Sequence, residues 1–189
     1  MSKKKLGFAL TGSFCTISKT LKLMEELSGI YDIVPIMSET AAATDTRFGT
    51  AEHFTQEIVR ITGKEPITSI AGAEPIGPKK MTDVMLVAPC TGNTLAKLAN
   101  GVNDTAVTMA VKSHLRNGKP VVIAVSTNDA LGASAENIGK LMVRRNIYFV
   151  PMRQDDTINK PMSVIADLTQ AEKAIEMALK GEQMQPVLK

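Results

Sequence analysis

Short apolar runs alternate with segments of helical periodicity along this 189-residue chain. A run of about five apolar residues has the length of a strand covered on both faces, and such strands belong to parallel sheets. Strands are predicted over residues 6–10, 33–37, 67–70, 84–88, 121–125 and 147–150. Pro35 indicates that the second strand lies at an edge of the sheet or that the strand starts there. Helices are predicted over residues 17–27, 51–61, 93–99, 105–115, 137–145 and 164–179. The alternation predicts an α/β fold, with a parallel sheet between two layers of helices.

Composition narrows the class of protein. A formal net charge of only +3 and an aromatic content of 4% argue against a nucleic-acid partner. Two cysteines are too few for a disulfide scaffold and fit a reducing compartment. The basic start at residues 3–5 precedes an apolar run too short for a signal peptide or a membrane span. Because the sequence shows no linker and no internal repeat, we expect one domain over residues 1–189. We also expect the protein to lie in the cytoplasm and to have no membrane partner.

Four polar segments follow the predicted strands. In a doubly wound sheet the ligand crevice lies at the carboxyl ends of the strands, where the strand order reverses. The four segments are rich in Gly, Ser, Thr and Asn and comprise residues 11–14, 38–50, 89–94 and 126–131. Residues 38–50 are long for a connecting loop, and such loops are often functional. The ligand site is therefore predicted where these segments meet.

The first and third segments carry groups suited to a phosphate. Gly12 allows a close approach of the backbone, Ser13 offers a hydroxyl, and the amides that begin the next helix can bind an anion. A Thr-Gly-Asn-Thr run over residues 91–94 gathers further donors and acceptors. These residues could instead have a purely structural role. Ser13 would then cap the helix that follows it, and either Asn93 or Thr94 would cap the next one.

These segments resemble motifs of the flavoprotein family that includes the homo-oligomeric flavin-containing cysteine decarboxylases and the flavin prenyltransferases. Members share a Gly-x-Thr-Gly-Ser-like loop, matched here by residues 10–13. They also share a Pro-x-Ser-Ala-Asn-Thr-like motif that runs into a Lys-x-Ala-x-Gly helix, matched by residues 89–94 and by Lys97, Ala99 and Gly101. The resemblance covers nearly the whole chain and implies a three-layer, Rossmann-like, doubly wound parallel sheet of the flavodoxin type.

The resemblance also implies a site for flavin mononucleotide (FMN). The phosphate would lie near Gly12, Ser13 and Ser38, and the ribityl chain and ring edge near residues 91–94. The expected cofactor-binding residues are Gly12, Ser13, Phe14, Ser38, Thr91, Gly92, Asn93, Thr94, Ser126 and Asn128. No catalytic residue is assigned, and no metal site is expected.

Four further segments resemble one branch of the family, which supplies the second component of a two-chain oxidoreductase in spore-forming bacteria. These segments are residues 44–49, 74–80, 126–132 and 146–151. The resemblance implies a dehydrogenase-like partner chain that brings NADPH or NADH, and a small dicarboxylate substrate in the cytoplasm of the sporulating mother cell. Arg47 is the candidate for holding a substrate carboxylate, since a guanidinium binds one with two parallel bonds. The alternative is a solvated Arg47 or an ion pair with Asp45.

Two departures from the cysteine decarboxylases limit what the resemblance implies about function. Their Pro-x-Met-Asn motif corresponds to residues 126–129, where only Asn128 is kept, and their active-site histidine has no counterpart in residues 71–75. Cysteine decarboxylation is therefore not expected. Three functions stay open: an FMN-binding component of an oxidoreductase complex, a non-catalytic scaffolding component with a vestigial phosphate pocket, and a free-standing FMN-dependent decarboxylase or prenyltransferase.

The remaining reactive side chains are expected to be structural. His53 and His114 are predicted at the surface or its boundary, and Cys15 and Cys90 as small buried apolar residues. Because aromatic residues are scarce, only Phe14 or Phe48 could stack on a flavin ring from within this chain. Aliphatic and Met contacts, or a neighbouring subunit, would then supply the rest. The resemblance implies a flavin at a subunit boundary, and together these points lead us to expect a homo-oligomer.

Overall fold

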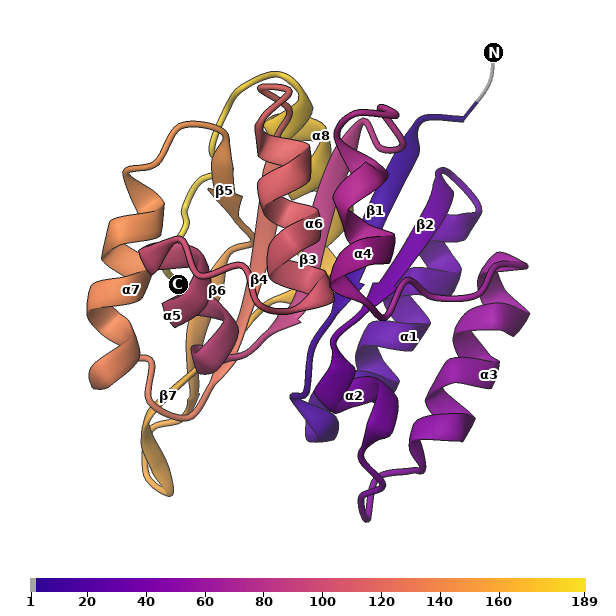
Figure 1. The fold of residues 1–189 in the computed structure, drawn as a ribbon. Coiled ribbons are helices and arrows are strands. Elements are labelled where there is room, and N and C mark those ends of the chain that lie inside the picture. Colours follow the sequence, from indigo (N-terminus) through magenta and orange to yellow (C-terminus); the bar gives the residue numbers. More distant parts are fainter. Residues whose placement is uncertain (1–2) are drawn as a thin grey trace.

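The computed structural model describes residues 3–189 and contains a seven-stranded, mostly parallel sheet (Figure 1). Its strands are β1 (Lys5–Leu10), β2 (Asp32–Met37), β3 (Val84–Cys90), β4 (Val121–Thr127), β5 (Ile147–Phe149), β6 (Met152–Asp156) and β7 (Lys160–Ala166). The order is β2-β1-β3-β4-β7-β6, with β5 paired to β4 beside this path. Strands β1 to β5 pair in parallel, whereas β7 runs antiparallel to β4 and β6.

Helices cover both faces of the sheet (Figure 1). They are α1 (Phe14–Ser28), α2 (Glu39–Ala43), α3 (Ala51–Thr62), α4 (Ile70–Ala73), α5 (Gly92–Asn100), α6 (Ala106–Leu115), α7 (Ala133–Met142) and α8 (Ala171–Leu179), with short 3₁₀ turns at Glu74–Ile76 and Leu168–Gln170. Ile17, Phe54 and Ile175 bury α1, α3 and α8 in one core, and Leu95 and Val107 bury α5 and α6 in the other. The predicted three-layer, doubly wound fold is therefore confirmed.

The local signals explain where the helices begin and end. Thr50 caps α3 by accepting a hydrogen bond from the His53 amide at 3.1 Å, and α3 ends at Gly63, whose φ of 67° suits glycine. Gly101 ends α5 in the same way, with φ of 72°. The edge position indicated by Pro35 is also correct, because β2 is the first strand of the sheet order.

The helix predicted over residues 164–179 is wrong over its first part. Residues 160–166 form β7 instead, and only Ala171–Leu179 are α-helical. The apolar spacing of Leu168, Ala171 and Ile175 is helical, and it extends by chance into the end of the strand. Pairing with β4 and β6 holds residues 160–166 extended, because tertiary contacts override a weak local pattern.

Smaller differences lie at the predicted loops and strand ends. The loop predicted over residues 38–50 contains α2, and residues 74–76 form a 3₁₀ turn. Strand β3 continues through Pro89 to Cys90, and α7 begins at Ala133 rather than at residue 137. The strand predicted over residues 67–70 is reduced to a bridge between Ile36 and Ile67. In residues 3–189 no helix is both long and apolar enough to cross a membrane.

Strand β4 changes partner along its length, and this places the β6–β7 hairpin at the ligand end of the sheet. Residues 121–123 pair with β5, whereas Ser126 and Thr127 pair with Ile165 and Val164 of β7. The hairpin therefore extends the sheet only where the parallel strands end, beside the loops predicted to form the crevice.

Candidate functional site

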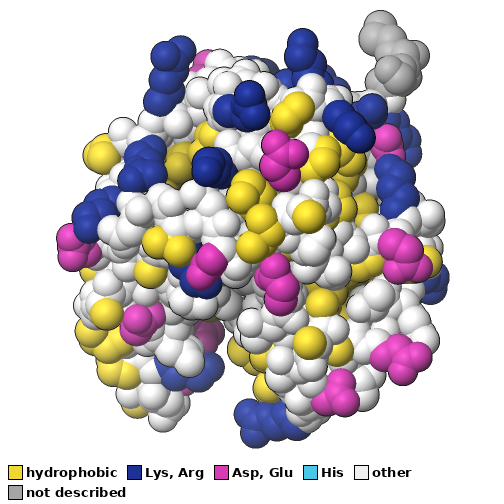
Figure 2. Space-filling view, in the orientation of Figure 1, with side chains coloured by type: hydrophobic (Ala, Val, Ile, Leu, Met, Phe, Trp, Pro, Cys, Tyr) yellow, Lys and Arg dark blue, Asp and Glu magenta, His cyan; other side chains and the backbone are white. Residues whose placement is uncertain are grey.

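A cleft of about 1070 Å³ lies at the carboxyl ends of β1, β3 and β4. Its walls come from α1 and the loop before it, from the loops after α2, β3 and β4, and from the β6–β7 hairpin. In Figure 2 the surface is hollowed at its lower edge, between the side that carries the hairpin and the side that carries α2 and α3. The chain leaves β1 toward β2 but leaves β3 toward β4, so the strand order reverses here, as it does at ligand sites of this fold.

Eight of the eleven predicted site residues line this cleft. They are Gly12, Ser13, Phe14, Arg47, Thr91, Gly92, Ser126 and Asn128. Ser38, Asn93 and Thr94 do not line it. Ser38 is buried and accepts a hydrogen bond from the Ala41 amide at 3.3 Å, which makes it the cap of α2. Asn93 is exposed, and the cap of α5 is Thr91 rather than Asn93 or Thr94.

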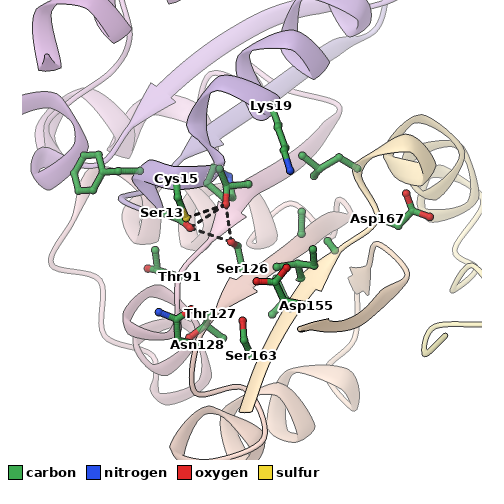
Figure 3. A pocket seen from close by; sticks show the side chains of 18 of the residues that line it. Ser13, Cys15, Lys19, Thr91, Ser126, Thr127, Asn128, Asp155, Ser163 and Asp167 are labelled. Atoms are coloured by element: carbon green, nitrogen blue, oxygen red, sulfur yellow. Dashed lines mark hydrogen bonds between the residues drawn. The ribbon is translucent and has the colours of Figure 1, made fainter. Parts of the chain in front are cut away.

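Three hydroxyl groups meet at the centre of the cleft (Figure 3). Ser13 Oγ lies 2.9 Å from Ser126 Oγ and 3.3 Å from Thr16 Oγ1, and Thr16 Oγ1 lies 3.1 Å from Ser126 Oγ. The closed triangle ties the start of α1 to the end of β4. Each hydroxyl can rotate its proton toward an incoming acceptor, so the same groups can serve a ligand.

The N-terminus of α1 is open to an anion. Ser13 precedes the helix but makes no side-chain cap, the first turn has no acidic residue, and within residues 3–189 the Phe14 and Cys15 amides donate to no acceptor. Free amides and the positive end of the helix dipole attract negative charge. A Cβ on Gly12 would meet only side-chain atoms at 3.6–3.7 Å, so the backbone is accessible beside these amides. These features fit a phosphate group.

The N-terminus of α5 differs, because a carboxylate of the chain already lies against it. Asp129 accepts hydrogen bonds from the Thr127 hydroxyl and from Ser134 Oγ, the latter at 2.8 Å. These bonds hold the pKa of Asp129 below its usual range. A Cβ on Gly92 would lie 2.8 Å from Asp129 Oδ1, so glycine is needed at this position for space. Of the two helix starts in the cleft, that of α1 has no carboxylate beside it.

Arg47 lies in the loop between α2 and α3 and lines the cleft. Its guanidinium stacks on Phe48, with Cζ 4.9 Å from the ring centroid. The alternative ion pair with Asp45 is not formed, since Asp45 accepts from the Ala51 amide at 2.9 Å and no salt bridge joins it to Arg47 within residues 3–189. Stacking orients the guanidinium and leaves its donors available to a ligand.

The wall formed by α1 and the β6–β7 hairpin was not predicted from the sequence. Lys19 on α1 and the hairpin residues Arg153, Asp155, Lys160 and Ser163 also line the cleft. No motif marks these positions, and the helix predicted over residues 164–179 concealed β7. The β-branched pair Val164 and Ile165 was the available signal for a strand.

The histidines are placed differently from each other. His53 is exposed, as expected, and does not line the cleft. His114 was expected near the surface but is buried at 1% exposure, with Nδ1 2.8 Å from Thr82 Oγ1 and Nε2 3.0 Å from the Pro120 carbonyl. The carbonyl can only accept, so Nε2 carries a proton and Nδ1 accepts from Thr82. Burial lowers the pKa of His114 to about 4.

The two cysteines also differ in their exposure to solvent. Cys90 is buried, as expected, and burial raises the pKa of its thiol. Cys15 was expected to be buried but is exposed and lines the cleft, because the first turn of α1 faces the ligand end of the sheet rather than the core.

Comparison with known proteins agrees with this geometry. The sequence matches the Flavoprotein family over residues 1–175. It is 44% identical over 186 residues to the B subunit of dipicolinate synthase from Bacillus subtilis (strain 168), covering 98% of this chain and 93% of that protein. The crystal structure of the corresponding B subunit from Bacillus halodurans matches with a TM-score of 0.91 and 44% identity, over 100% of this chain and 97% of that one. The FMN-dependent cysteine decarboxylase SpaF shares the fold, with a TM-score of 0.70 and 22% identity over 95% of this chain and 98% of that one. This chain belongs to the Flavoprotein family.

Proposed function

We propose that the cleft binds FMN, with the phosphate at Gly12, Ser13 and the open N-terminus of α1. The free amides of Phe14 and Cys15 are the observation that carries this proposal, because a phosphate would satisfy them. The cleft, at about 1070 Å³, is large enough for a cofactor together with a small substrate. The membership of the Flavoprotein family supports a flavin in particular. Bound FMN would supply hydride or electron transfer.

We further propose that the chain works as the B subunit of a dipicolinate synthase. The A subunit of that enzyme, a dehydrogenase-like partner that uses NADPH or NADH, would join it in forming dipicolinate from a dihydrodipicolinate-type precursor in the cytoplasm of a sporulating mother cell. The support is the 44% identity to a dipicolinate synthase B subunit over nearly the whole chain. Arg47, with its guanidinium held on Phe48, is proposed to bind a carboxylate of this acidic precursor.

Ser13→Asp tests the phosphate position. A carboxylate beside the first amides of α1 would repel the phosphate and compete for its donors, so we expect FMN affinity to fall by at least tenfold. Ser18→Asp is the matched control, because Ser18 is an exposed residue of the same helix outside the cleft lining. FMN binding is followed by the quenching of flavin fluorescence during titration. Equal affinities for the two variants would contradict the placement.

Arg47→Ala tests the substrate position. A charge-assisted hydrogen bond contributes about 1.5–3 kcal/mol, so we expect the KM for the precursor to rise at least tenfold when both subunits are present. Lys173→Ala, an exposed position outside the cleft, serves as the control for loss of a positive charge. An unchanged KM in Arg47→Ala would remove Arg47 from the site. Full activity of a flavin-free complex would favour the scaffolding role instead.

A further inference from the structure

The end of the sheet opposite the cleft carries an excess of positive charge. Parallel strands begin at the same edge of a sheet, so the segments that lead into β1, β3, β4 and β5 lie together there. We call this surface the basic face, and its segments are residues 3–5, 74–83, 116–120 and 143–147. They hold nine Lys or Arg residues against two acidic residues, in a chain whose net charge is only +3. Dark-blue Lys and Arg side chains gather across the upper part of Figure 2, where these strands begin (Figure 1).

Hydrogen bonds join the segments of the basic face into one surface. Asn117 Nδ2 donates to the Gly77 carbonyl at 2.7 Å, which ties the turn before β4 to the turn before β3. The Val121 amide donates to the Asn146 carbonyl at 2.8 Å, which ties the start of β4 to the segment before β5. At about 4.8 Å per strand, the starts of β1 and β5 are roughly 14 Å apart. One partner surface can therefore reach all four segments.

Most cations of the basic face have no partner within the chain. Of its two acidic residues, Asp83 pairs with Lys119 at 3.0 Å, whereas Glu74 forms no salt bridge within residues 3–189. In the same range, six exposed cations make no salt bridge and no hydrogen bond through their side chains. They are Lys4, Lys5, Lys79, Lys80, Arg116 and Arg145.

Lys80 holds a backbone conformation that favours glycine. Its φ is 49°, and the turn is fixed because the Lys80 amide donates to the Gly77 carbonyl at 2.9 Å and the Met81 amide to the Ile76 carbonyl at 3.0 Å. A Cβ in the left-handed region raises the free energy of the folded chain. Since the Lys80 side chain is exposed and pairs with nothing in the described part of the chain, this strain indicates a role outside the fold.

A groove of about 450 Å³ lies at the β5 end of the basic face. Arg145 and Tyr148 line it together with the apolar side chains of Met142 and Val187, and no carboxylate of residues 3–189 does. Val143, which follows Met142, is 86% exposed. Arginine, tyrosine and methionine are enriched at the centres of protein interfaces, whereas lysine belongs to their polar rims. The groove therefore suits an apolar side chain that is flanked by carboxylates.

We propose that the basic face docks a protein that presents clustered Asp and Glu side chains, and that this protein is the A subunit of the proposed complex. The identity of the partner rests on the proposed function, whereas the chemistry of the surface does not. A second copy of this chain is disfavoured, because a two-fold contact would bring the same cations together. The cleft lies at the other end of the sheet, so a docked partner would leave it open to flavin and substrate.

Surface plasmon resonance with the immobilised A subunit and the full chain tests the docking surface. Lys80→Glu and Arg145→Glu are each expected to weaken binding at least tenfold, mainly through a slower association, and the wild-type affinity is expected to fall as salt rises. Lys173→Glu is the matched control, since Lys173 is an exposed residue of α8 outside both the basic face and the cleft. Its affinity should stay within about twofold of the wild type, because distant surface charges are screened.

Lys80→Gly separates binding from folding. It removes the cation and relieves the backbone, so binding should weaken at least threefold while the urea midpoint of unfolding stays equal or rises. Unchanged binding together with a lower midpoint would show that Lys80 serves the fold, and would overturn its role in docking.

The outcomes separate the docking surface from the proposed function. Equal binding of the A subunit by the wild type, Lys80→Glu and Arg145→Glu would overturn the docking surface and leave the proposed function standing. No binding of the A subunit by the wild-type chain would overturn both. An equal loss in Lys173→Glu would show only an effect of net charge and would overturn the surface. Loss of binding to phosphatidylglycerol vesicles in the same variants, with unchanged binding of the A subunit, would assign the face to a membrane and overturn the proposal.

Discussion

Single polar side chains decide which ends of the secondary-structure elements can serve a ligand. Ser38 and Thr91 serve as the caps of α2 and α5, and the Asp129 carboxylate lies close to Gly92 at the start of α5. Ser13 precedes α1 without capping it, which leaves the amides of that helix available. Residues of the same chemical type therefore have opposite roles, and only their hydrogen-bond partners distinguish them.

Buried His114 makes the stability of the fold depend on pH. Its pKa is about 4 in the folded chain, against about 6.5 in an unfolded one, so the unfolded chain takes up the proton first. This contribution to stability is complete above pH 6.5 and is lost as pH falls toward 4. At pH 5 the loss amounts to roughly 2 kcal/mol.

Urea unfolding at pH 7 and pH 5 measures this loss. His114→Gln can keep both hydrogen bonds but cannot titrate, so its free energy of unfolding should fall by roughly 2 kcal/mol less than that of the wild type between the two pH values. Because the carboxylates titrate equally in both proteins, the difference isolates the histidine. An identical fall in both proteins would contradict the assignment.

At the scale of elements, a close backbone contact joins α6 to the turn before β3. The Gly77 amide donates to Ser113 Oγ at 2.8 Å, and a Cβ on Gly77 would lie 2.0 Å from the Ser113 carbonyl oxygen. This contact sets the distance of α6 from the segment that precedes β3. It supports the sheet face opposite α1 and lies outside the ligand cleft.

Gly77→Ala should destabilise the fold by roughly 1–3 kcal/mol, because backbone must move to accept the methyl group. Gly139→Ala is the matched control, since Gly139 lies within α7 and a Cβ there would meet no atom within 4 Å. Removing a helical glycine should raise stability by up to about 1 kcal/mol. Unfolding in urea compares the two, and changes of the same sign and size would contradict the packing described.

The elements also show how far the sequence predicts the fold. The buried runs that became β1, β3 and β4 could be recognised because both faces of these strands are covered by helices, which leaves a continuous apolar pattern. Strand β6 has the sequence Met-Arg-Gln-Asp-Asp, which contains no continuous apolar pattern. Its extended conformation depends on pairing with β7, which a local sequence pattern does not show. The motif loops predicted one part of the cleft lining, whereas Arg153, Asp155 and Ser163 belong to the hairpin wall, which the sequence pattern did not reveal.

At the scale of the whole molecule, two cores on opposite faces of the sheet leave a ligand cleft open at one end. Phe14 and Phe48 are the aromatic residues that line the cleft, and Phe48 is 43% exposed. Val143 and Ile158, both 86% exposed, add apolar surface outside it. One chain therefore provides few contacts for a flat ring, which supports the expectation of an oligomer.

Light scattering on the FMN-loaded chain tests this expectation. We expect a molar mass that is a multiple of the 20.3 kDa chain and stays constant over a tenfold range of concentration, because a neighbouring chain would be needed to complete the ring contacts. A mass of one chain together with full FMN binding would show that the ring pocket is self-contained.

The visible absorption spectrum of the wild-type chain, recorded after incubation with FMN and gel filtration, tests the flavin site most directly. The open N-terminus of α1 and the cleft beside it predict that flavin absorption stays with the protein peak, at one FMN for each chain. A colourless protein peak, with all FMN eluting as free cofactor, would contradict the flavin site.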